Sequence, residues 1–121
     1  MKSKKTTDAD FMVFKDEVNR LIRKFRIDDW RIYYTLERLK GNNAECVTNA
    51  VSKTATFHLN TSIYVYTDDE IKALAMHEVC HLLIADISDL ASCRWVIFDE
   101  VNRADESVAN KLKVIFMELG V

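Results

Sequence analysis

Proline is absent from this chain of 121 residues, and glycine occurs only twice. Linkers and sharp turns are rich in these two residues, so their scarcity argues against several domains joined by flexible segments. No stretch is long and apolar enough to span a bilayer. With 49% hydrophobic residues, the composition predicts one globular domain over residues 1–121, in which residues 1–6 form a flexible N-terminus.

Cysteine is also scarce, since Cys46, Cys80 and Cys93 are too few and too scattered for a disulfide framework. No apolar segment of signal-peptide length follows the basic N-terminus, and together these features predict a cytoplasmic protein. Cys80 is expected to behave as a small buried hydrophobe. A net charge of −2 gives no reason to expect binding to nucleic acid or to an anionic membrane.

Hydrophobic periodicity predicts an α+β fold. A first helix, capped by Thr7 or Asp8, has a nearly ideal apolar stripe for one buried face. Alternation in residues 30–36 and in two later segments, 45–51 and 54–60, predicts a small antiparallel sheet of about three strands, backed by this helix. The stripe of the first helix consists of Phe11, Phe14, Val18, Leu21, Ile22 and Phe25.

The most informative feature is His77-Glu78-Val79-Cys80-His81, an H-E-x-x-H motif. Thr67 and Glu70 have the spacing of a capping box, so a helix is expected to begin there and to carry the motif. Histidines four residues apart lie on one helical face, where both imidazoles can bind one Zn²⁺ ion. Glu78 lies beside that face and can act as a general base without being a ligand. The surrounding segment is strongly apolar, so the motif helix is expected to be buried.

A catalytic zinc site usually has three protein ligands, so the chain should supply one more. Glu106 is the preferred candidate, because an amphipathic helix begins near it and Asn110 lies one turn further on nearly the same face. Asn110 could then accept the N–H of a ligating histidine. Glu100 is the alternative ligand. Asp86 and Asp89 are set aside, since Asp86 is rotated away from the histidines and Asp89 falls in an expected turn.

The motif and the later segment Asp105–Asn110 resemble the gluzincin branch of the zincin metallopeptidases, whose later helix reads N-E-x-x-x-D. The resemblance covers residues 54–119. In its short length the chain is similar to the small zinc peptidase domains of phages and prophages. It implies a minimal zincin-like fold in which a C-terminal helix carries the third ligand. Asn110 stands where the family has aspartate. The spacing from His81 to Glu106 is longer than in thermolysin, a member of that branch, and Glu100 fits that spacing better.

The expected function is therefore zinc-dependent peptide-bond hydrolysis, with His77, His81 and Glu106 as metal ligands and Glu78 as the catalytic base. A peptide or protein is the expected substrate, and a protein partner could deliver it, because so short a chain has little material for deep subsites. Two alternatives stay open: a non-catalytic zinc-binding regulatory or interaction module, and a metal-dependent hydrolase of a non-peptide substrate.

Three further side chains near the motif could assist the reaction. His58 could face the cleft from a strand, although such a histidine is more often simply exposed. Tyr64 or Tyr66 could stabilise the tetrahedral intermediate through its hydroxyl, although a tyrosine in such a position is more often part of the core.

Overall fold

The computed structural model describes residues 2–92 and 97–120, so Cys93 lies outside the described residues. The described chain is α+β, with four helices and two small sheets. No helix in it is long and apolar enough to cross a membrane. The elements follow in the order β1 (Lys4–Lys5), α1 (Asp8–Lys24), β2 (Arg31–Glu37), β3 (Ala44–Asn49), β4 (Thr54–Asn60), β5 (Ser62–Ile63), α2 (Asp68–Leu83), α3 (Ala85–Ala91) and α4 (Phe98–Glu118).

The main sheet has the three expected strands, but it is mixed rather than antiparallel. Its strand order is β2-β4-β3, in which β3 pairs with β4 antiparallel and β2 pairs with β4 parallel. The turn at residues 40–43 reverses the chain without making a hairpin, because β4 lies between the two strands that the turn joins. The strand β3 therefore has one free edge within the described structure, and this edge borders the site described below.

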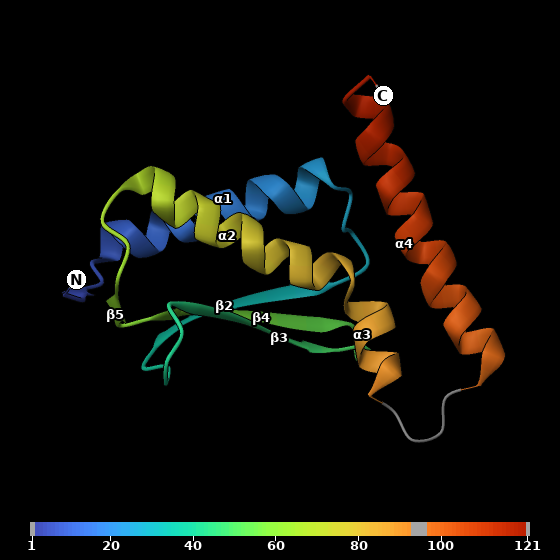
Figure 1. Ribbon diagram of the computed structural model, residues 1–121, viewed down its shortest axis with the longest axis horizontal. Helices are drawn as coiled ribbons and strands as arrows, with labels where there is room; N and C mark the ends of the chain where they lie inside the picture. Colours follow the sequence, from blue (N-terminus) through green and yellow to red (C-terminus); the bar gives the residue numbers. More distant parts are fainter. Residues whose placement is uncertain (1, 93–96, 121) are drawn as a thin grey trace.

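Two helices, α1 and α2, lie side by side on one face of this sheet (Figure 1). The expected stripe of α1 is confirmed, with Phe14, Val18 and Leu21 buried in the core against the sheet. Thr7 caps α1, and it forms a capping box with Asp10. Apolar side chains at alternate positions of β4, including Phe57 and Leu59, complete the core beneath both helices.

The N-terminus is more ordered than the composition suggested. Lys4 and Lys5 form β1, which pairs antiparallel with Ile63 and Ser62 of β5. Thr6 is buried, and its backbone N–H donates to the carbonyl of Thr61 over 2.9 Å. The expectation of a flexible segment over residues 1–6 was therefore wrong for residues 4–6, because long-range pairing with β5 holds them.

The motif helix ends earlier than expected, and this changes the positions of the residues that follow. The helix α2 stops at Leu83, and α3 begins at Ala85 after a break at Ile84. The turn that was expected at Asp89 is instead part of α3. The last helix, α4, stands at the far end of the layered core and packs against α3 (Figure 1).

Candidate metal centre

The H-E-x-x-H motif lies in the second half of α2, on the side of the helix that faces the edge of the sheet. Thr67 caps this helix as predicted, because its side chain accepts the N–H of Glu70 over 3.1 Å. One face of α2, with Ile71, Ala75 and Val79, is buried in the core. This anchoring sets the rotation of the helix and hence the direction of the motif side chains.

The expectation that the whole motif is buried was wrong. His77, His81 and Cys80 are exposed, whereas Glu78 is only 6% exposed. The apolar residues of α2 cover less than its full circumference, so one stripe of the helix reaches the surface. The two histidines therefore do not need a metal to offset burial. The evidence that they bind a metal is instead the way their side chains lie relative to one another.

The imidazoles of His77 and His81 face one another. Their Nε2 atoms lie 3.2 Å apart, and their rings meet edge to face, with centroids 4.9 Å apart and planes at 83°. Two nitrogen ligands of one tetrahedral zinc, each about 2.0–2.1 Å from the ion, are about 3.3 Å apart. The observed separation therefore fits two neighbouring positions in a zinc coordination shell.

Glu78 lies between the histidines in sequence but points into the protein. Burial raises the pKa of its carboxyl group above the ordinary glutamate value, and the nearby charge of Glu45 raises it further. His77, His81 and the backbone amide of Cys46 act in the opposite direction, since each favours the charged carboxylate. The balance leaves Glu78 with a raised pKa, which suits a group that must both accept and return a proton.

A pocket of about 350 Å³ opens in front of the motif. His77, Glu78 and His81 form one wall, the edge strand β3 forms another, and the α2–α3 junction closes the end. The pocket is lined further by Asn42, Ala44, Glu45, Cys46, Thr48, Ile84, Ala85, Ser88 and Asp89. Burial also raises the pKa of the Cys46 thiol to about 12, so this cysteine stays protonated in the pocket wall.

The structure does not bring the predicted third ligand to the histidines. Glu106 and Asn110 are exposed on α4, and none of the described residues of α4 lines the pocket. Glu100, the alternative, lines a different cavity with Asp86 and Arg103. Over residues 2–92 and 97–120, no group of three histidine, cysteine, aspartate or glutamate side chains is close enough to hold a metal ion. The assignment of Glu106 therefore remains a prediction from the sequence.

Sequence reasoning missed two carboxylates that line the pocket, Glu45 and Asp89. Glu45 is at the edge of β3, and no motif marks it. Asp89 was set aside because a turn was expected there, but the break at Ile84 places it on α3 facing the pocket. The Thr48 hydroxyl donates to its two carboxylate oxygens over 2.9 and 3.1 Å.

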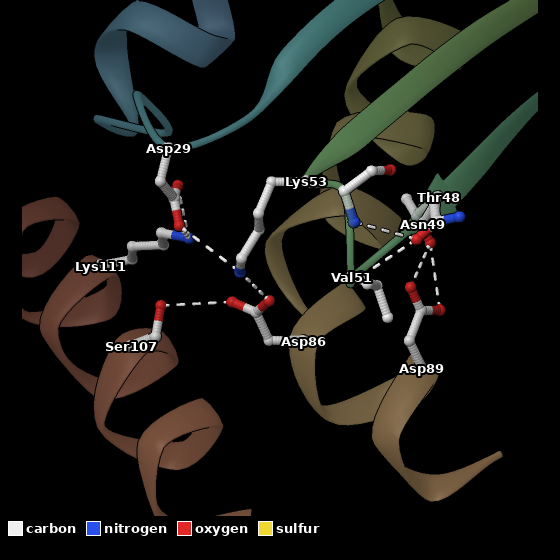
Figure 2. Close-up of polar contacts among 10 residues, drawn as sticks. Asp29, Thr48, Asn49, Val51, Lys53, Asp86, Asp89, Ser107 and Lys111 are labelled. Atoms are coloured by element: carbon white, nitrogen blue, oxygen red, sulfur yellow. Dashed lines mark hydrogen bonds and ion pairs between the residues drawn. The ribbon is translucent and has the colours of Figure 1, made fainter. Parts of the chain in front are cut away.

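A polar network fixes α3 against the end of the sheet (Figure 2). Lys53, in the turn between β3 and β4, forms an ion pair with the buried Asp86 of α3 and approaches Asp29 at 3.8 Å. Lys111 of α4 pairs with the same Asp29 at 3.2 Å. Ser107 donates a hydrogen bond to Asp86 over 3.3 Å. These contacts and the Thr48–Asp89 hydrogen bond hold α3 in position, and α3 forms the far wall of the pocket.

The other candidate residues lie away from this pocket. His58 is on β4 and contacts the Thr35 hydroxyl and the Glu37 carboxylate, the latter at 2.9 Å. Tyr64 and Tyr66 are exposed, and neither lines the pocket. Tyr64 lines a second cavity nearby.

Comparison with known proteins adds no family to these observations. The chain matches no protein-family model, no curated protein and no solved structure.

Proposed function

We propose that this chain is a zinc-dependent metallopeptidase whose active site is the pocket in front of α2. The observation that carries the proposal is the 3.2 Å separation of the His77 and His81 Nε2 atoms, beside a buried glutamate. Both nitrogens would hold the ion. When bound, zinc lowers the pKa of water and polarises a carbonyl group.

Glu78 is the proposed catalytic residue that moves the proton. In its charged form it accepts a proton from the attacking water, and it then delivers that proton to the leaving nitrogen of the peptide bond. Its raised pKa supports this role, because a carboxyl group with an ordinary pKa is a weaker base at neutral pH. Burial and the Cys46 amide keep the carboxylate oriented toward the pocket wall rather than free in solvent.

The free edge of β3 is the proposed binding surface for an extended substrate. Ala44, Cys46 and Thr48 lie at alternate positions of this strand and line the pocket. A peptide that adds to the edge would form main-chain hydrogen bonds and would run past the histidines. Because such binding depends on main-chain hydrogen bonds and not on side-chain subsites, a small pocket is sufficient for it.

Sequence and structure propose different residues for the third ligand. The gluzincin-like pattern proposes Glu106, which would require α4 to lie against the pocket in the metal-bound protein. The lining of the pocket proposes Asp89, whose carboxylate accepts a hydrogen bond from Thr48 in the pocket wall. We favour Asp89, because it lines the pocket in front of α2 and Glu106 does not, and variants of both residues distinguish the two proposals.

A non-catalytic zinc-binding module is the second candidate. The missing third ligand among the described residues favours it, because a pair of histidines alone can hold a metal without arranging it for catalysis. The experiment that separates the two functions is a cleavage profile over an unbiased peptide library. Zinc-loaded wild type should cleave peptides and Glu78→Gln should not. Absence of cleavage by wild type, with zinc bound, would favour the module.

A further inference from the structure

A second cavity borders the proposed active site, and the side chains that line it differ in charge from those of the first. It has a volume of about 460 Å³, and Asn42 lines both it and the pocket in front of α2. The loop before β3, the segment after β4 and Ser3 enclose it. A chain bound along the edge of β3 would therefore pass from one cavity into the other.

The two cavities differ in charge. The described lining of the first includes the carboxylates of Glu45, Glu78 and Asp89 and no lysine or arginine. The described lining of the second includes Arg38 as its one charged residue, together with neutral amides and hydroxyls. Arg38 is exposed, and it makes no ion pair with any described residue. A guanidinium without a partner, surrounded by neutral hydrogen-bonding groups, suits a carboxylate.

The walls of this second cavity are held in place before any ligand binds. Asn60 is only 9% exposed, and its side-chain amide donates to the carbonyls of Leu39 and Asn42 over 2.9 and 2.8 Å. Its side-chain oxygen accepts the N–H of Ser62 over 3.2 Å. Asn43 accepts the N–H of Tyr64 over 3.0 Å, which ties the loop to the opposite wall.

We infer that the second cavity, named here the Arg38 subsite, binds a carboxylate of the substrate. The inference deepens the proposed peptidase function and rests on it. Cys46, beside Glu78, is four residues from Asn42, so the Cα atoms of these two residues lie within about 13 Å of each other. That distance corresponds to about four residues of extended peptide. The carboxylate belongs to an aspartate or glutamate side chain or to the C-terminus of the substrate.

The test measures binding at the Arg38 subsite without relying on turnover. Amide NMR spectra of zinc-loaded Glu78→Gln protein are recorded during titration with four acetylated polyalanine peptides. One has a free C-terminus and one is amidated. The other two are amidated and carry either glutamate or glutamine at one position. The expected result is that free-acid or glutamate peptides shift the amides of Asn42, Asn43 and Ser62, whereas the amidated and glutamine peptides do not.

The same titration with Arg38→Gln in the Glu78→Gln background should weaken carboxylate binding on the order of tenfold. Arg23→Gln is the matched control, since Arg23 is exposed on α1 and lines neither cavity. The response to the free-acid and glutamate peptides separately identifies the source of the carboxylate. Equal shifts for acidic and amidated peptides, or unchanged affinity in Arg38→Gln, would overturn the inference.

Cleavage by the wild type separates the two proposals. Cleavage without any preference for a carboxylate would remove the Arg38 subsite and keep the peptidase. Carboxylate-dependent shifts without cleavage of any peptide would keep the Arg38 subsite and remove the peptidase.

Discussion

The Nε2 atoms of His77 and His81 lie 3.2 Å apart across one turn of α2. This separation is about that of two nitrogens on one tetrahedral zinc, so the purified chain should bind about one zinc ion. His77→Ala and His81→Ala should each abolish stoichiometric binding, measured by metal analysis after dialysis. His58→Ala is the control, because His58 is on β4 and does not line the pocket. Full zinc retention in either motif variant would refute the site.

The third ligand can be identified by competition with a chromogenic chelator. We expect Asp89→Ala to lower zinc affinity steeply and Glu106→Ala and Glu100→Ala to be near neutral, because Asp89 is the one of these three that lines the pocket. Thr48→Val controls for the lost hydrogen bond, since it removes the donor and keeps the carboxylate. A steep loss in Glu106→Ala with normal binding in Asp89→Ala would restore the sequence-based ligand. Asn110→Ala should then cost about 10–100-fold in affinity.

Glu78 should make the metal-free protein less stable as pH rises. Its pKa in the folded protein is raised above the ordinary value of 4.5, so the folded state holds the proton more tightly than the unfolded state. The free energy of unfolding is therefore unaffected at pH values below that ordinary value, and it falls as pH rises through the folded-state pKa. The free energy of unfolding falls by about 1.4 kcal/mol for each tenfold difference between the acid dissociation constants of Glu78 in the unfolded and the folded state.

Urea unfolding of chelator-treated wild type and Glu78→Gln, between acidic and neutral pH, measures this effect. The variant should be the more stable protein at neutral pH, and the advantage should shrink toward zero in acid. An advantage that is constant over the pH range would mean that the carboxyl group does not cause it.

The Lys53–Asp86 pair should stabilise the fold and the far wall of the pocket. Lys53→Met leaves the Asp86 carboxylate buried without its cation, which costs about 1–3 kcal/mol after allowance for the 39% exposure of the Lys53 side chain. Asp86→Asn in the same background should recover part of the loss, as a double-mutant cycle in urea measures. Additive losses in the double variant would show that the two residues are not coupled.

Lys53 also has a positive φ of 54°, in the left-handed region that glycine adopts without strain. Lys53→Gly and Lys53→Ala lose the same ion pair, but only the glycine variant relieves this strain. The glycine variant should therefore be the more stable of the two, by about 1 kcal/mol. This comparison separates the contribution of the backbone from that of the charge.

Features that depend on neighbouring residues in the sequence were predicted well. The caps at Thr7 and Thr67, and the buried stripe of α1, follow from side chains within one or two helical turns. The parallel pairing of β2 with β4 could not be predicted in this way, since strand order depends on contacts between distant segments. The order of residues 4–6 was missed for the same reason, because β5 supplies the partner strand.

In the candidate site too, the features set by neighbouring residues were predicted and those set by distant segments were not. The positions of His77, Glu78 and His81 relative to one another are a property of one helix, so the motif specifies them. Which carboxylate joins them depends on how α3 and α4 pack, and no local pattern encodes this packing. A helix break at Ile84, without proline or glycine, brought Asp89 to the pocket where a turn had been expected.

In the proposed function, Glu78 moves the proton while His77 and His81 hold the metal. The most direct measurement records zinc content and peptide hydrolysis on the same preparations of wild type, Glu78→Gln and His77→Ala. Glu78→Gln should retain about one zinc ion and lose hydrolysis by several orders of magnitude, because it loses a base but no ligand. His77→Ala should lose both. Hydrolysis by Glu78→Gln at the wild-type rate, with zinc still bound, would contradict the account.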